Sequence, residues 1–168
     1  MRYLLAVIAL ALSSANDNHT TQQDLIGAWR LVDIQVQGPA GREADPFYGN
    51  GSRGLLIYDA SGWFSVQIEG ADRPAVKVPV ARPAAQSSTA DSLKADSKAL
   101  HSYYAYFGTW SFDPATSTVT HHAKGALYPS EDAAVYPQHV EVVGRRMTFS
   151  RSQNGKVQKK LWERVSGQ

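Results

Sequence analysis

Two adjacent histidines, His121 and His122, are the side chains of this sequence best suited to acid–base chemistry. They lie in Thr118–Lys124, a segment typical of a strand, where neighbouring side chains point to opposite faces. His121 shares its face with Val119 and Ala123. We therefore expect His121 to face the interior and His122 to face solvent. An inward histidine could carry a proton, anchor a ligand, or simply be buried and hydrogen-bonded to a tyrosine or a backbone carbonyl.

Aromatic side chains close to this strand in the sequence could supply the second group that acid–base chemistry needs. If the protein is an enzyme, Tyr104 is the expected catalytic partner of His121, because a tyrosine hydroxyl can donate or accept a proton. The tyrosines could instead only seal a helix against the rest of the fold, and the other aromatic residues could only fill a core. The residues expected to contact a ligand are His121, Tyr103, Tyr106, Trp63, Trp110 and Phe112.

Other patterns lack the context that their chemistry requires. The segment 49–54 has the glycine spacing of dinucleotide-binding loops, but it precedes a strand instead of joining a strand to a helix. The histidines have no local chelating spacing, so we expect no metal and no cofactor. Basic residues of the last strands alternate with apolar ones, which is typical of a solvated exterior and not of a nucleic-acid-binding patch. These residues are Arg145, Arg146, Arg151, Lys156, Lys159 and Lys160.

Composition is that of an ordinary globular protein. The chain has 168 residues, 43% of them hydrophobic, and a formal net charge of +2. This length fits one domain, and the charge indicates neither a nucleic acid nor a membrane surface as a partner. The sequence has no cysteine, which excludes disulfides, thiolate nucleophiles and cysteine-based metal sites.

The first fifteen residues have the pattern of a secretory signal peptide. Arg2 precedes an apolar run from Leu4 to Leu12, and small residues follow at 13–15. The apolar run is shorter than the roughly twenty residues that cross a bilayer. We therefore expect a signal peptide over residues 1–15, a polar spacer over 16–23 and a mature domain over 24–165. The mature chain is expected to be secreted or periplasmic and to contain no membrane-spanning segment.

Turn signals divide the expected domain into strands and one helix. Gly62 and the Asn154-Gly155 pair mark hairpins, whereas three prolines between residues 70 and 86 indicate an irregular connection. Apolar residues at helical spacing predict a helix over residues 90–105. The expected strands are Ala28–Gln37, Leu55–Asp59, Trp63–Ile68, Gly108–Phe112, Thr118–Lys124, Tyr136–Val143, Arg146–Ser152 and Lys156–Arg164. Because strands and helices do not alternate, an all-β barrel or sandwich is favoured over a parallel α/β sheet.

Five segments of the chain resemble, in order, a family of small bacterial and fungal barrels called the lipocalin-like domain family. They are Leu25–Val32 with its Gly27-Ala28-Trp29 signature, Pro46–Gly49, Arg53–Tyr58, Tyr104–Trp110 and Thr118–His122. The resemblance implies an antiparallel barrel of about eight strands with the helix packed across it. It also implies that Trp29 closes the barrel floor against a basic residue of the last strand, here Arg164. The chain departs from the family pattern at residues 128–131 and 138–140, so contacts of that loop are expected to differ.

An exported barrel of this kind has two main possible functions. Small barrels either fill with side chains or enclose one ligand, so we expect a binding protein for a small hydrophobic or amphipathic molecule. Its cavity would be rimmed by the 70–90 connection and the helix. The alternative is an isomerase or cyclase that uses His121 and a tyrosine on an apolar substrate, in which case His121→Phe would abolish turnover and leave the melt nearly unchanged. A filled barrel that acts through its surface is a third possibility, and the oligomeric state stays open.

Overall fold

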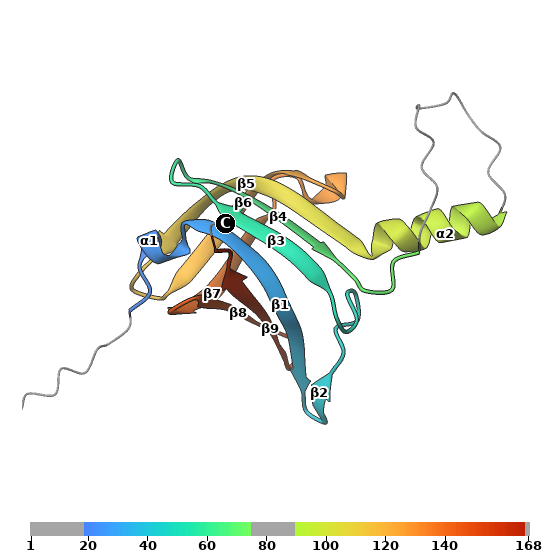
Figure 1. The fold of residues 1–168 in the computed structure, drawn as a ribbon, viewed down its shortest axis with the longest axis horizontal. Coiled ribbons are helices and arrows are strands. Elements are labelled where there is room, and N and C mark those ends of the chain that lie inside the picture. Colours follow the sequence, from blue (N-terminus) through green and yellow to red (C-terminus); the bar gives the residue numbers. More distant parts are fainter. Residues whose placement is uncertain (1–18, 75–89, 167–168) are drawn as a thin grey trace, which may run out of the picture.

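A computed structural model describes residues 19–74 and 90–166 of the chain. The strands form one antiparallel meander, and pairing of β1 with β9 closes eight of them into a barrel (Figure 1). The strands are β1 Gly27–Gly38, β2 Gly41–Glu43, β3 Arg53–Tyr58, β4 Trp63–Glu69, β5 Tyr103–Asp113, β6 Thr118–Ala126, β7 Val135–Val143, β8 Arg146–Gln153 and β9 Lys156–Arg164. The prediction of an eight-stranded antiparallel barrel is confirmed. The expected signal peptide lies outside the described residues, so it stays a prediction.

Two features of the strands differ from the expectation. The short strand β2 pairs with the end of β1, where the glycines around Pro39 predict only a turn. Strand β5 begins at Tyr103, five residues before the expected strand, and pairs along its whole first half with β4. Its inward residues Tyr106, Gly108 and Trp110 recur every second position, so the aromatic segment has the period of a strand.

The helices are short and lie at opposite ends of the barrel. The first, α1 (Gln22–Leu25), precedes β1, and the 3-10 turn η1 (Pro129–Glu131) follows β6. The main helix, α2 (Ala90–His101), ends before the tyrosines, because these pair in β5. It projects from the end of the barrel where β5 begins, instead of crossing the barrel as the resemblance implies (Figure 1). Its contact with the barrel includes the buried Ala99, whose carbonyl accepts from the Arg73 guanidinium at 3.2 Å.

The α1 end of the barrel is closed by Trp29, as the resemblance implies. Trp29 is 0% exposed, and its indole nitrogen donates to the Leu25 carbonyl at 2.8 Å. The Arg164 guanidinium lies 4.2 Å from the centroid of the Trp29 ring and donates to the carbonyls of Asp24 and Ile26. Gly27 fits beneath this guanidinium because it has a φ of +130° and no Cβ; a Cβ there would lie 2.9 Å from Arg164 Nη1. The predicted floor is therefore confirmed.

The barrel core lies above this floor. Inward side chains of all eight barrel strands pack in one cluster. Its fully buried members include Trp29, Leu56, Tyr58, Met147 and Trp162. The interior farther from α1 is not filled in the same way, and that half carries the candidate site.

Candidate functional site

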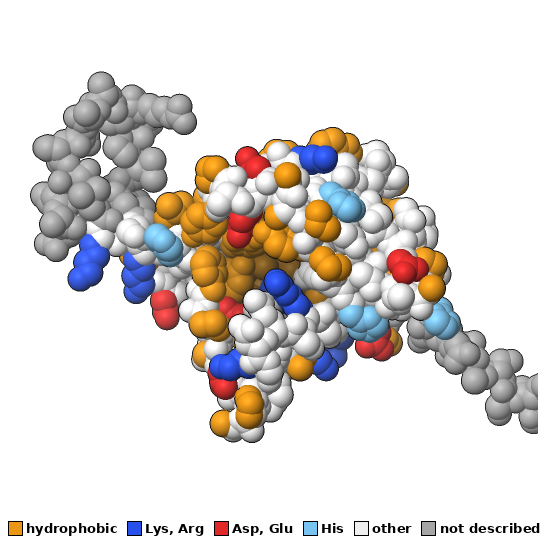
Figure 2. Space-filling model, turned by 180° about the vertical axis from the view of Figure 1, so that it is seen from behind, with side chains coloured by type: hydrophobic (Ala, Val, Ile, Leu, Met, Phe, Trp, Pro, Cys, Tyr) orange, Lys and Arg blue, Asp and Glu red, His pale blue; other side chains and the backbone are white. Residues whose placement is uncertain are grey.

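The half of the barrel away from α1 contains an open cavity of about 750 Å³. Its mouth lies between the loop that follows β2, the η1 segment and the tip of the β8–β9 hairpin. Figure 2 shows this face of the molecule hollowed, with hydrophobic side chains in the hollow and a basic side chain over it. A volume of this size lies within the range of small-molecule binding pockets. The expected rim of α2 is wrong, because no residue of α2 lines the cavity; the other expected part, the 70–90 connection, lies mostly outside the described residues and stays a prediction.

Tyrosines form one wall of the cavity. Tyr104 and Tyr106 come from β5 and Tyr136 from β7, with the ring centroid of Tyr106 5.2 Å from that of Tyr104 and 5.4 Å from that of Tyr136. Tyr48 and Tyr128 complete the wall from the loops. Burial raises the pKa of Tyr48, Tyr104 and Tyr106 well above the usual tyrosine value. These hydroxyls therefore stay neutral at physiological pH and offer hydrogen bonds without charge.

The opposite wall is basic. Arg151 of β8 and Gln158 and Lys160 of β9 line it, and Lys160 pairs in register with the inward residues Ile34 and Phe149. The pKa of Lys160 is lowered to about 8, chiefly by burial; the Asp45 carboxylate opposes this shift, and the charge of Arg151 adds to it. Lys160 is therefore mainly positive at pH 7. An anionic or strongly polar end of a ligand fits this wall better than a second apolar group.

The Asp45 carboxylate organises the loop beside the basic wall. One of its oxygens accepts hydrogen bonds from the backbone amides of Phe47 and Tyr48, both at 2.9 Å, and the other accepts from the Gln158 amide at 2.6 Å. Asp45 is buried, and these three donors engage both of its oxygens. The loop that carries Tyr48 is thereby fixed to β9.

His121 lies inside the barrel, as strand alternation predicts, and is 1% exposed, whereas His122 is half-buried on the other face. The His121 ring stacks on Phe64, with ring centroids 4.1 Å apart. Nε2 is hydrogen-bonded to the Tyr58 hydroxyl, and Nδ1 lies 2.7 Å from the Tyr106 hydroxyl. Burial lowers the pKa of His121 to about 3, so the imidazole is neutral. The predicted orientation and the neighbouring tyrosine hydroxyl are confirmed.

The hydrogen-bond network assigns the tautomer of His121. The Tyr58 hydroxyl is fully buried, and His121 Nε2 is its hydrogen-bond partner within the described chain. A buried hydroxyl needs an acceptor for its proton, so Tyr58 donates to Nε2 and the ring proton resides on Nδ1. Nδ1 then donates to the Tyr106 oxygen. The Tyr106 proton is left without an acceptor among the described residues, and Tyr106 itself lines the wall of the cavity.

The sequence-predicted site residues divide into two groups. Tyr104 and Tyr106 line the cavity, while His121 sits behind Tyr106 and does not reach the lining. Trp110 is buried in the core, where its indole nitrogen donates to the Asp59 carbonyl at 3.3 Å, and Phe112 packs on the same core. Neither lines the cavity, because both lie on the part of β5 nearer the floor.

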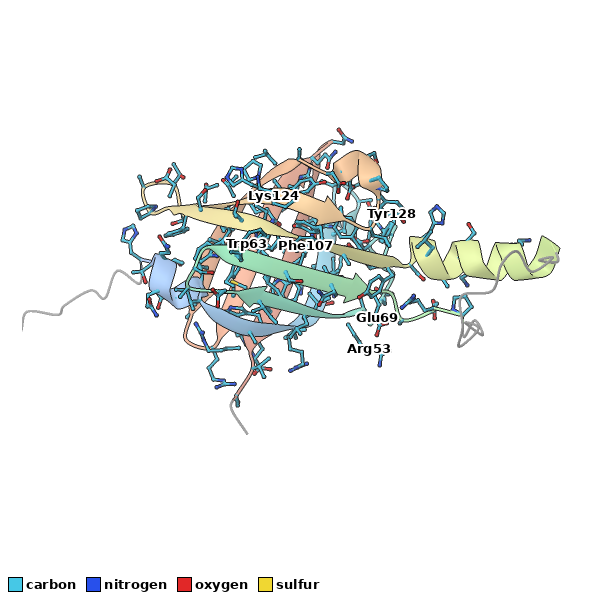
Figure 3. All side chains as sticks on the ribbon, turned by 90° about the horizontal axis from the view of Figure 1, so that it is seen from above. Arg53, Trp63, Glu69, Phe107, Lys124 and Tyr128 are labelled. Atoms are coloured by element: carbon cyan, nitrogen blue, oxygen red, sulfur yellow. The ribbon has the colours of Figure 1, made fainter. Side chains whose placement is uncertain are left out.

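Trp63 and Tyr103 lie on the outer side of the sheet. Trp63 is 48% exposed, and Figure 3 shows it near Phe107 on the outer face of β4 and β5. It faces outward because the next residue, Phe64, belongs to the inward set of β4. The Tyr103 ring is covered by the Arg73 guanidinium at 4.8 Å instead of lining the cavity. The sequence prediction that these two residues contact a ligand is therefore corrected.

Several cavity residues are missing from the sequence prediction. Arg151 and Lys160, assigned there to a solvated exterior, line the cavity. Inward positions alternate from Trp162 back to Lys160 on β9 and from Met147 through Phe149 to Arg151 on β8. That alternation is the signal that could have found them. Tyr48 and Tyr128 come from loops, for which no periodicity exists, whereas Tyr136 shares its face of β7 with the inward residues Val140 and Val142. Buried Tyr128 Oη and Glu131 Oε2 have no hydrogen-bond partner among the described residues, and both residues line the cavity.

The described ranges show two further features that bear on the kind of site. No three metal-binding side chains gather there in a geometry that could hold an ion. Within the same ranges, no helix has the length and apolarity needed to span a bilayer.

Comparison with known proteins identifies the family of this chain. The model of the lipocalin-like domain matches residues 26–164. None of the curated proteins matches the chain. Solved structures with a similar chain path include a fatty acid transporter, REP1-NXSQ, at 12% identity and a TM-score of 0.40, which covers 87% of this chain and 99% of its own. A mutant of the fluorescent protein UnaG has 11% identity and a TM-score of 0.39, over 86% and 99%. Secretory abundant heat soluble protein 4 from Ramazzottius varieornatus has 11% identity and a TM-score of 0.41, over 88% and 99%.

Proposed function

Because this chain belongs to the lipocalin-like domain family, we propose that its barrel binds one small amphipathic molecule. The apolar part of the ligand lies along the tyrosine wall, and its polar end lies at the basic wall of Arg151, Gln158 and Lys160.

We also propose that the protein acts outside the cytoplasm, from the signal-peptide pattern of residues 1–15. N-terminal sequencing of the protein recovered from a secretion host tests this second point, and an uncleaved chain retained in the cytoplasm would contradict it.

The observation that carries the binding proposal is the asymmetry of the cavity. A barrel that acts through its surface would fill its interior with side chains, whereas this one keeps a cavity of about 750 Å³ beside its core. In this cavity, neutral tyrosine hydroxyls face a lysine and an arginine across open space. Such an arrangement favours a ligand with one apolar and one anionic or carbonyl-bearing end, because both walls are then matched.

Calorimetric titration with three twelve-carbon probes tests this match. Laurate carries an anionic end, dodecanol a neutral end and dodecyltrimethylammonium a cationic end, while the chain length stays the same. We expect 1:1 binding in the order laurate, dodecanol, dodecyltrimethylammonium. Equal binding of all three would show that the basic wall does not contact the ligand, and no binding of any would contradict the proposed function.

Replacing Lys160 with glutamine is expected to weaken laurate binding about tenfold, because the change removes a charge-assisted hydrogen bond to the carboxylate. Binding of dodecanol should change much less. The matched control is Lys159→Gln, since Lys159 is the exposed neighbour on the outer face of the same strand. If both lysine variants weaken laurate binding equally, the effect is one of overall charge and the assignment of Lys160 to the site is wrong.

The enzymatic alternative with His121 as the acid–base group has less support. His121 is separated from the cavity by Tyr106, and both ring nitrogens are already hydrogen-bonded to tyrosines. Its pKa of about 3 keeps it neutral, so it does not supply a proton at neutral pH. These features favour a structural histidine that orients the Tyr106 hydroxyl toward the ligand.

A further inference from the structure

We infer that the Lys160 amine forms a reversible imine with a ligand that carries an aldehyde or ketone group. This inference rests on the proposed function and narrows its ligand class from an amphipathic molecule to a carbonyl compound. It assigns a covalent role to the Lys160 amine, which non-covalent binding of a ligand would not require.

The first argument is the position of the amine. Lys160 extends from β9 into the interior, between the register partners Ile34 and Phe149, and lines the cavity. No hydrogen bond or ion pair of its amine is found within the described ranges, although Asp45 is close enough to affect it electrostatically. Both Asp45 oxygens are already engaged by Phe47, Tyr48 and Gln158. The amine is therefore available to a ligand.

Lys156, on the same strand and at the same cavity, shows the contrast. Its ammonium forms an ion pair with Glu43 at the mouth. The Glu43 carboxylate therefore occupies the amine of Lys156, whereas that of Lys160 has no such partner within the described ranges. Lys160 lies deeper in the cavity, between its apolar register partners on β1 and β8. A buried lysine in apolar surroundings is the kind used for imine chemistry.

The second argument is the availability of the uncharged amine. Burial lowers the pKa of Lys160 from 10.5 to about 8. At pH 7.5 the uncharged fraction of such an amine is about two hundredfold larger than that of an exposed lysine. The nearby charges have opposite effects on the Lys160 pKa, because the Asp45 carboxylate raises it and Arg151 lowers it. The neutral His121 adds no charge of its own.

The third argument is a hydrogen-bond donor for the carbonyl oxygen. Tyr106 lines the cavity that Lys160 also lines, and the tautomer of His121 leaves the Tyr106 proton without an acceptor among the described residues. Phe149, the register partner of Lys160, has its ring 6.3 Å from the His121 ring that is hydrogen-bonded to Tyr106, so the two groups belong to the same region of the interior. A hydroxyl at this place can polarise the carbonyl of a bound aldehyde without becoming charged.

The reaction balances without any further reagent. The Nζ lone pair attacks the carbonyl carbon, and the carbon–oxygen double bond becomes a hydroxyl after a proton moves from nitrogen to oxygen. The resulting carbinolamine then loses the hydroxyl and the remaining amine proton as one water molecule. A carbon–nitrogen double bond forms, nothing is oxidised or reduced, and addition of water reverses the step.

Reductive trapping tests the inference with octanal as the probe. The protein is mixed with a substoichiometric amount of octanal and sodium cyanoborohydride at pH 7.5, and modified lysines are located by peptide mass spectrometry. We expect modification at Lys160 to exceed that at exposed Lys159 at least tenfold. Lys160→Arg should abolish this major adduct, whereas the matched control Lys159→Arg should retain it.

Competition in the unmodified protein provides a second readout that needs no variant. Saturating laurate should suppress modification at Lys160 and leave that at Lys159 unchanged. Modification spread evenly over exposed lysines, or insensitive to laurate, would overturn the inference. If laurate binds by calorimetry but no adduct forms at Lys160, only the imine fails; if laurate does not bind either, the proposed function fails with it.

Discussion

The Trp29→Ala variant is expected to lose about 3–5 kcal/mol of unfolding free energy, the usual cost of truncating a large buried aromatic side chain. Trp29 is completely buried at the barrel floor, where its indole donates to the Leu25 carbonyl. Truncation would also remove the ring beneath the Arg164 guanidinium, an interaction of about 0.5–2 kcal/mol. Chemical denaturation followed by circular dichroism measures the change.

Trp63→Ala is the matched control for this variant. Trp63 is 48% exposed on the outer face, so its truncation should cost no more than about 1 kcal/mol. Equal stability losses in the two variants would mean that the floor does not anchor the barrel.

The His121→Phe variant is expected to lose about 1–3 kcal/mol, because it strands the buried Tyr58 hydroxyl without an acceptor. This replaces the sequence-based expectation of a nearly unchanged melt, which considers ring volume alone. The double variant His121→Phe with Tyr58→Phe removes both polar partners and should recover most of the loss. Denaturation of the two single variants and the double variant completes the cycle. Additive losses would contradict the hydrogen bond as the cause.

The pH dependence of the same variants provides an independent check. The pKa of His121 is about 3 in the folded protein and about 6.5 in the unfolded chain, so the unfolded state binds the proton first. The contribution of the neutral ring is therefore complete above pH 6.5 and is lost progressively as the pH falls toward 3. Denaturation at pH 7 and pH 5 should show a smaller acid loss in His121→Phe than in the parent protein.

Strand alternation and one pair of anchor residues account for most of what could be predicted from the sequence. Alternation within Thr118–Ala126 orients His121 correctly, because no bulge lies between Thr118 and Ala123 in its pairing with β5. The Trp29–Arg164 contact follows from the position of both residues at facing ends of β1 and β9. The sequence alone does not decide whether Tyr103 and Tyr104 belong to a helix or to a strand, since their spacing fits both. Pairing with β4, a tertiary interaction, decides between the two.

The chemistry of the cavity depends on features that a linear pattern does not contain. Lys160 and Arg151 resemble surface residues in composition; alternation assigns Lys160 to one face of β9, but only closure of β9 against β1 and β8 turns that face toward a cavity. Tyr48 and Tyr128 are held by loops whose geometry comes from side-chain contacts such as those of Asp45. The orientation of the Tyr106 proton depends on the burial of a third residue, Tyr58. Such features become visible only in three dimensions.

The most direct test of the central claim, that the open half of the barrel is a ligand site, is a chemical-shift titration by NMR. The isotope-labelled protein is titrated with laurate, and backbone and methyl signals are followed. We predict that the largest shifts occur at Val36, Ala44, Tyr104, Tyr106 and Lys160, which line the cavity. Signals of Trp63 and Phe107 on the outer face should stay in place. Shifts confined to that outer face, or no shifts at saturating laurate, would contradict the account.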